Sequence, residues 1–104
     1  MSIANASITT TDTSLITVPA DKSYAIITIL VCNTGVNSTS FDAHVIKSGQ
    51  SKSDRNKVLT GVPVQGKDTF TFNAERLILD EADSLLLFAD SDAGLHTTVS
   101  FLEV

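Results

Sequence analysis

The sequence contains a single cysteine, Cys32, and no tryptophan. One cysteine excludes a disulfide bond within the chain. Because Cys32 lies inside an apolar run, we expect a small buried hydrophobic side chain; a nucleophilic thiol needs an exposed, electropositive setting. Aromatic residues make up only 6% of the chain, namely Tyr24 and five phenylalanines. Most of them are needed for a core, so little aromatic surface is left on which a sugar could stack.

Basic residues are also few. Seven Lys and Arg against 12 Asp and Glu give a formal charge of −5, which argues against general nucleic-acid binding, because phosphate binding needs clustered basic side chains. A loose basic group occurs in a serine-rich segment and predicts a solvated loop: Lys47, Lys52, Arg55 and Lys57. The longest apolar run is about half the length that spans a bilayer. The first residues lack the pattern of a secretory signal, so we expect a soluble protein with no membrane partner.

That apolar run, residues 23–33, is the stretch around which the chain is organised. Its isoleucine and valine residues predict a long strand. Strict alternation divides its side chains between two faces, with Tyr24, Ile26, Thr28, Leu30 and Cys32 on one and Ala25, Ile27, Ile29, Val31 and Asn33 on the other. Both faces are largely apolar, so we expect cover on both sides, the outer one from an N-terminal arm or another subunit. This surplus apolar face predicts a protein that associates.

Seven further segments read as strands, separated by turns rich in Gly, Asn, Asp and Ser. They are residues 14–18, 39–46, 58–64, 69–72, 76–79, 84–89 and 95–104. No segment shows a helical period. About eight short strands predict an all-β fold, a single antiparallel β-sandwich that is jelly-roll-like. We expect two parts, an N-terminal arm or edge strand over residues 1–13 and the sandwich domain over residues 14–104.

Three local patterns refine this fold. Residues 39–46 alternate, and a hairpin with the strand at 23–33 is the simplest pairing. Residues 47–57 are polar and form a surface loop that is longer than most hairpin connections, so it either carries function or crosses between sheets. Residues 58–64 contain Gly61 and Pro63, which predicts an edge strand or a strand with a bulge.

The two histidines, His44 and His96, are far apart in the sequence and have no neighbouring metal ligands at a useful spacing. We expect both to face outward and to be solvated. His44 with Asp42 and a serine would form a catalytic triad only if the fold assembled them, because triads are recognised by geometry. The spacing of these residues gives no support for one.

The acidic turns are the other candidates for chemistry. Residues 90–94 begin like a calcium loop, but the twelfth position is Phe101 where a bidentate Glu is required. We therefore expect polar, solvated turns both there and at residues 80–83. No Gly-rich phosphate loop, paired cysteines or nucleophile elbow is present. We predict a protein that is not an enzyme, with no catalytic, cofactor-binding or metal-binding residues and no cofactor. A hydrolytic enzyme that uses His44 and the acidic turns is a remaining alternative.

One order of elements is familiar. The first part of the chain has a short strand, then Val18-Pro19-Ala20, a Lys turn, a long β-branched strand and Cys32-Asn33-Thr34. A later part has Val62-Pro63-Val64, a Gly-Lys-Asp turn and the run 77–85. From about residue 14 to 104 the chain resembles small stand-alone β-sandwich proteins among the structural proteins of tailed bacteriophages. The resemblance implies a non-enzymatic virion component, assembled in the host cytoplasm.

Within a virion, the leading expectation is a decoration or cement protein that stabilises the shell of a phage head through oligomeric contacts. A homotrimer would suit local three-fold positions of a head, and its partner would be the major capsid protein or another virion protein. Residues 1–13 are the expected docking arm and residues 47–57 the expected contact surface. The alternative is a tail, fibre or baseplate component that binds a host surface, such as a glycan, or another virion protein.

Overall fold

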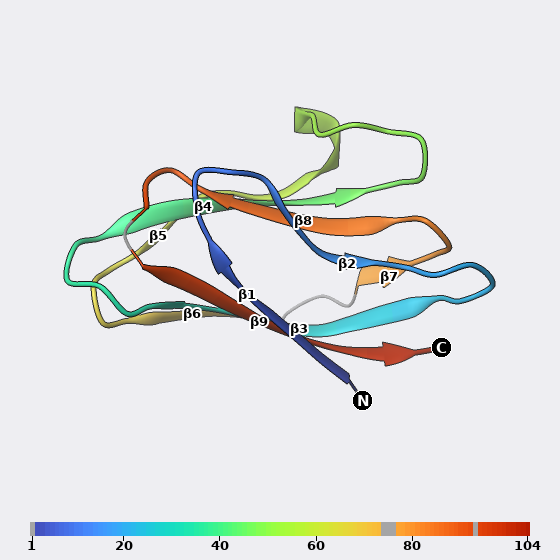
Figure 1. Cartoon of the computed structure of the whole chain (residues 1–104), viewed down its shortest axis with the longest axis horizontal. Helices are drawn as coiled ribbons and strands as arrows, with labels where there is room; N and C mark the ends of the chain where they lie inside the picture. Colours follow the sequence, from blue (N-terminus) through green and yellow to red (C-terminus); the bar gives the residue numbers. More distant parts are fainter. Residues whose placement is uncertain (1, 74–76, 93) are drawn as a thin grey trace.

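The computed structural model describes residues 2–73, 77–92 and 94–104, and in these ranges the strands form two antiparallel sheets packed face to face (Figure 1). Sheet A has the order β1 (Ser2–Ile8), β9 (Leu95–Glu103), β3 (Tyr24–Asn33) and then β6 (Thr69–Phe72) and β7 (Leu77–Leu79), which both pair with β3. Sheet B has the order β2 (Thr13–Thr17), β8 (Ser84–Ala89), β4 (Thr39–Ile46) and β5 (Lys57–Val64). A short 3-10 turn, η1 (Asp54–Asn56), precedes β5.

The topology is that of a jelly roll. β6 and β7 run along the edge of β3 opposite β9, with β7 beside Tyr24, Ala25 and Ile26 and β6 beside the stretch from Ile29 to Cys32. Counted as one interrupted strand, they reduce the fold to eight. The first strand then lies beside the last, the second beside the second-last, and so on to β4 beside β5. This is a long antiparallel double strand rolled into two sheets, and it confirms the predicted β-sandwich.

The predicted hairpin between residues 23–33 and 39–46 is wrong, because β3 and β4 lie in different sheets. The connection between them carries the chain across the sandwich, and the buried Asn33 holds this corner. Its side-chain amide donates to the carbonyl oxygens of Asn37 (2.8 Å) and Val64 (3.1 Å), and its Oδ1 accepts from the Gly35 N–H (2.9 Å). Local hydrogen bonds of this kind favour a turn over a continued ladder.

A bulge in β3 changes which residues face the core. The pairing with β9 shifts register between Ile26 and Thr28, and Ile26 and Ile29 are both buried in the core. Under strict alternation these two isoleucines would lie on opposite faces. The extra residue changes the phase, so the outer face beyond the bulge carries Thr28, Leu30 and Cys32. Tyr24 and Ile26, which alternation placed on one face with Thr28, Leu30 and Cys32, therefore face the core, and the predicted outer apolar face does not run the length of the strand. Leu30 is the one exposed large hydrophobic residue of β3.

The core lies between the sheets and draws on both. Its buried members are Ile8, Ile16, Val18, Ile26, Ile29, Val31, Phe41, Ala43, Val64, Leu79, Leu85, Leu87, Ala89, Leu95 and Val99. Phe70 and Phe72 pack against this cluster from β6, as their shared face predicted, and the rings of Phe41 and Phe70 meet edge to face with centroids 5.6 Å apart. In the described ranges, no helix has the length and apolar character needed to cross a membrane.

The other strand predictions agree closely with the structure. β5 is an edge strand with two register shifts, as Gly61 and Pro63 predicted. The loop 47–57 joins neighbouring strands of sheet B, so it does not cross between sheets. The predicted strand at 76–79 is present as β7 from Leu77 onward. Arg76, and Ala93 of the acidic turn at 90–94, lie outside the described residues.

Candidate interaction surfaces

The loop 47–57 folds back over the outer face of sheet B (Figure 1). Two contacts of Lys52 fix its far end: Nζ lies 2.9 Å from Asp12 Oδ1 and 4.1 Å from the centre of the Phe88 ring. Phe88 projects from β8 on the face opposite the core residue Leu87. A lysine over an aromatic face is attracted by the ring quadrupole. The loop is therefore ordered by one side chain of β8 and one of the turn before β2, although its composition predicted a solvated segment.

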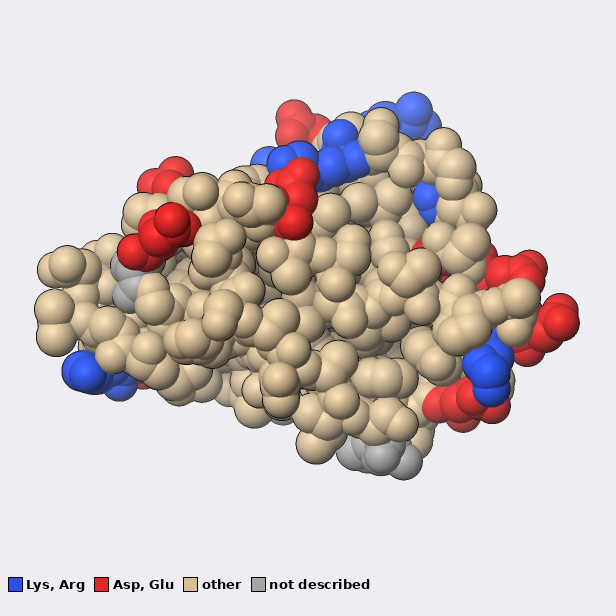
Figure 2. Space-filling model, in the orientation of Figure 1, with Lys and Arg blue, Asp and Glu red and all other residues tan. Residues whose placement is uncertain are grey.

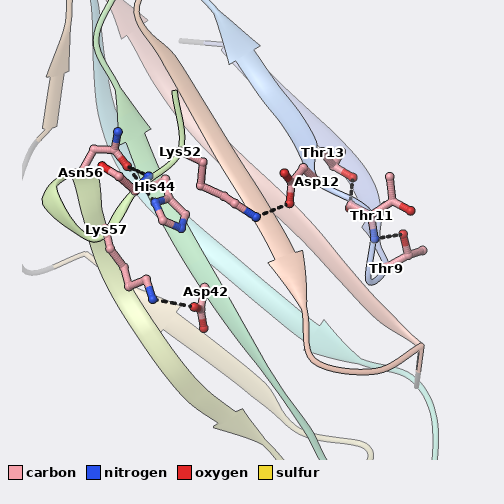
Figure 3. A network of polar contacts seen from close by, with 10 residues as sticks. Thr9, Thr11, Asp12, Thr13, Asp42, His44, Lys52, Asn56 and Lys57 are labelled. Atoms are coloured by element: carbon pink, nitrogen blue, oxygen red, sulfur yellow. Dashed lines mark hydrogen bonds and ion pairs between the residues drawn. The ribbon is translucent and has the colours of Figure 1, made fainter. Parts of the chain in front are cut away.

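Asn56 is the central anchor of this loop (Figure 3). Its Oδ1 accepts hydrogen bonds from the Ser53 N–H (3.1 Å) and from Nδ1 of His44 (2.8 Å), and its amide nitrogen donates to the Ser51 carbonyl oxygen (2.9 Å). One side chain thus ties three points of the chain together. The sequence offered one signal for this role: Asn56 follows Ser53 by three residues, the spacing of a capping box. In the structure its side chain accepts the Ser53 N–H in that way.

The prediction that His44 is solvated is wrong, because only 2% of it is exposed. Alternation places it on the outer face of β4, but the loop covers that face. The ring stacks on Phe88 with centroids 5.9 Å apart. Since Asn56 offers an oxygen, Nδ1 is the donor of this hydrogen bond, and Nε2 is buried without a hydrogen-bond partner among the described residues. His96, by contrast, is exposed on sheet A, where Nδ1 lies 3.0 Å from Ser7 Oγ.

Lys57 joins the loop to β4 by charge. Its Nζ lies 3.2 Å from Asp42 Oδ2 and 3.5 Å from Asp54 Oδ1. The hydrogen bond to Asp42, helped by the charges of both carboxylates, raises the pKa of Lys57 above its ordinary value. Asp42 also accepts a hydrogen bond from the Gly61 N–H at 2.7 Å, beside the bulged part of β5. Asp42 therefore holds the strand edge and does not contact His44 as a triad would require.

The acidic turn at 80–83 is buried at one position, so the prediction of a wholly solvated turn is wrong. Asp83 is only 4% exposed. Its carboxylate accepts from the Ser48 N–H (2.9 Å) and the Asp80 N–H (3.0 Å), and Lys47 Nζ lies 3.9 Å away. Backbone N–H groups satisfy a buried carboxylate better than a distant ammonium does. Asp83 thus fixes the start of the loop 47–57.

A shallow hollow of about 360 Å³ lies between this loop and β7. Its apolar side chains include Val58, 38% exposed, and Ile78, 57% exposed. Lys47, Arg55 and Lys57 supply positive charge around it, and Asp83 contributes a carboxylate. We call these residues the loop hollow. The hollow thus combines exposed aliphatic side chains with basic ones.

The outer face of sheet A differs from the loop hollow in having few charges. Its rows carry small polar side chains, such as Asn5, Thr98 and Thr71 on either side of Leu30. Cys32 lies in the next row and is half-buried, so it is more exposed than its place in an apolar run predicted. In the acidic turn at 90–94, Asp92 Oδ1 accepts from the Thr10 N–H at 2.9 Å. That carboxylate ties the connection between β1 and β2 to the turn before β9.

The described ranges contain no group of three or more His, Cys, Asp or Glu side chains placed to hold a metal ion. No family model and no curated protein matches the sequence. A solved structure described as "Acidic stable capsid structure of Helicobacter pylori bacteriophage KHP30" contains a chain of similar fold, with a TM-score of 0.56 and 11% sequence identity. The likeness covers 99% of this chain and 91% of that chain. At this identity it shows the fold: this sandwich is also the fold of a chain in a phage capsid structure.

Proposed function

We propose that this chain is a structural component of a bacteriophage virion, and specifically a decoration or cement protein that reinforces the head. The observation that carries the proposal is the shared fold with a chain of a phage capsid structure, which extends over nearly the full length of both chains. The sequence resemblance to small stand-alone β-sandwich proteins of phage virions supports the same conclusion. A non-enzymatic role is part of the proposal.

The loop hollow is the surface through which we propose that the chain binds the shell. Val58 and Ile78 would be covered, and each square ångström of apolar surface removed from water contributes about 25 cal/mol. Lys47 and Arg55 at the same place suit a shell protein that offers carboxylates beside an apolar patch. Such a contact is weak in one copy. Its effect on a shell grows with the number of copies bound.

The major capsid protein is the proposed partner, and a homotrimer at local three-fold positions is the proposed arrangement. Closed rings are common among homo-oligomers, and a three-fold ring matches the symmetry of those positions. Residues 1–13, which include β1 at the edge of sheet A, are proposed as a docking arm, a second contact beside the loop hollow. A virion protein of this kind would be assembled with the shell in the host cytoplasm.

Localisation in purified virions tests the proposal directly. A specific antibody with an electron-dense label, imaged on intact particles, should mark the head surface. Label confined to the tail would replace the head assignment with a tail, fibre or baseplate component, whose ligand would be a host surface or another virion protein. Virions without any label would contradict a virion role altogether.

A binding experiment tests the surface. Heads assembled without this chain should bind the purified protein, and Ile78→Asp should reduce binding because it places a charge in the loop hollow. Val36→Asp is the matched control, since Val36 is also an exposed apolar residue, 78% exposed, and lies outside the hollow. Equal binding by the two variants would contradict the assignment of the contact to the loop hollow.

A further inference from the structure

β1 forms one edge of sheet A, and it lacks the features that protect the other edges. Proteins guard exposed edge strands with proline, lysine, bulges or short length. β5 contains Gly61, Pro63 and two register shifts, while β2 has a register shift and is followed by Pro19. β6 and β7 are short. β1 has seven residues, none of them charged, and pairs with β9 from Ser2 to Ile8 without a register shift.

The sequence of β1 is compatible with pairing to itself. Asn5 is its middle residue, and Ala4 and Ala6 flank it symmetrically. With Asn5 opposite its own copy in an antiparallel pair, Ala4 lies opposite Ala6 and the exposed Ile3 opposite Ser7. All seven residues are paired in this register, and outward side chains meet outward side chains, as the period of two requires. The two Asn5 amides can hydrogen-bond to each other, since each group both donates and accepts.

Charge also favours a second copy at this edge. A two-fold axis brings each nearby charged side chain against its own copy, and like charges directly opposite one another are destabilising. The neighbouring strand β9 has no Asp, Glu, Lys or Arg before Glu103, which is paired with Lys22 at 2.8 Å at the end of the strand. In a chain with a net charge of −5, this edge is a local exception. In Figure 2 the charged side chains gather at the rim and the ends, and the centre of the face is uncharged.

We propose that β1 pairs antiparallel with β1 of a second copy of this chain, about a two-fold axis at Asn5, so that the A sheets of two copies become one continuous sheet. The ladder would extend over about 24 Å, at about 3.4 Å per residue. It would cover the free backbone groups of both edges and shield Ile3, which is 66% exposed. Because the contact uses the same edge of both copies, it forms a dimer and not the three-fold ring proposed above, and a copy paired in this way does not offer β1 to the shell. The pairing does not rest on the proposed function.

A charge-exchange experiment tests this pairing with the full chain. In sedimentation velocity at rising concentration, the protein should change from 11.0 kDa to twice that mass. Asn5→Lys and Asn5→Glu should each weaken association roughly fivefold or more, through like charges at the axis. An equimolar mixture of the two variants should restore it, because lysine then faces glutamate. Restoration on mixing also shows that both variants are folded.

Thr71→Lys is the control, because Thr71 is exposed on β6, at the other edge of the same sheet. It should leave the dimer dissociation constant unchanged. A wild-type protein that stays monomeric at every concentration would overturn the proposal. An association, three-fold or otherwise, that Asn5→Lys leaves unchanged would overturn it as well, and so would two variants that fail to complement each other.

Discussion

Nδ1 of His44 lies 2.8 Å from Oδ1 of Asn56, and this hydrogen bond joins a strand of sheet B to the loop that covers it. The loop is polar and lies on the surface, yet it shields a histidine that would otherwise be solvated. Its order depends on a small number of side chains. Single substitutions can therefore separate the loop from the sandwich without touching the core.

Asn56→Ala should destabilise the protein by about 1–3 kcal/mol, because the buried Nδ1–H of His44 loses its acceptor. Urea unfolding measures the change, and hydrogen exchange should show faster exchange in residues 48–56. Gln50→Ala is the control in the same loop: its exposed side chain should contribute less than about 0.5 kcal/mol. Equal effects of the two substitutions would contradict the anchoring role of Asn56.

The ion pair of Lys57 and Asp42 predicts a dependence on alkaline pH. The pKa of Lys57 is raised in the folded state by its hydrogen bond to Asp42. The stability that this pair contributes is therefore fully present below the unfolded-state pKa, about 10.4, and is lost as the pH rises through the folded-state value. The difference in unfolding free energy between the wild type and Lys57→Gln should stay constant from neutral pH to about pH 10 and then shrink.

Asp42→Asn gives the control for that measurement. Without the carboxylate the pKa of Lys57 has lost its largest cause of elevation, so adding Lys57→Gln to this background should give a difference that varies little with pH. If the difference in unfolding free energy between the wild type and Lys57→Gln grew between pH 10 and 11, it would contradict a stabilising ion pair.

Two leucines test which face of each sheet is the core. Leu87 is fully buried between the sheets, and Leu87→Ala should cost about 2–5 kcal/mol through lost contacts and the cavity left behind. Leu30 lies on the outer face beyond the bulge and is 36% exposed, so Leu30→Ala should cost much less. Chemical denaturation of both variants checks this. Similar losses would mean that the outer face of β3 is covered after all.

Gly66 predicts a steric effect at the corner between the sheets. A Cβ added at Gly66 would overlap the backbone oxygen of Val36, so Gly66→Ala must move the backbone near Val36. We expect a lower thermal midpoint, with a loss of stability of about 3 kcal/mol, at the upper end for single substitutions. Gly49→Ala is the comparison. Gly49 has φ +83° with open space around it, and it should lose only about 1–2 kcal/mol, the usual cost of a positive φ.

Much of this fold follows from local pattern. The eight predicted segments are close to β2–β9, since alternation and turn residues are local signals. The pairing of strands was not predictable in the same way, because periodicity does not state which strands are neighbours. The hydrogen bonds of Asn33 hold the corner at which the chain crosses to β4 in the other sheet, and an alternation pattern does not predict such bonds.

The candidate surfaces were predicted less well, and for two physical reasons. The one-residue bulge at Ile27 placed Tyr24 and Ile26 on the core face, which interrupted the expected apolar outer face. The burial of His44 depends on a loop folding back, and alternation alone cannot show cover that comes from elsewhere in the chain. The location of the loop 47–57 was predicted, but its anchor at Asn56 was not.

The central place of β9 has a consequence for synthesis. β9 lies between β1 and β3, so sheet A cannot close until Leu95–Glu103 has left the ribosome. Until then the long apolar strand β3 has one open edge, and β1 has no partner in sheet A. Folding of this protein should therefore wait for β9 and be slow for its size, as long-range pairing requires. Ribosome-stalled chains that end before β9 should be bound by chaperones, whereas chains from which β9 has emerged should not.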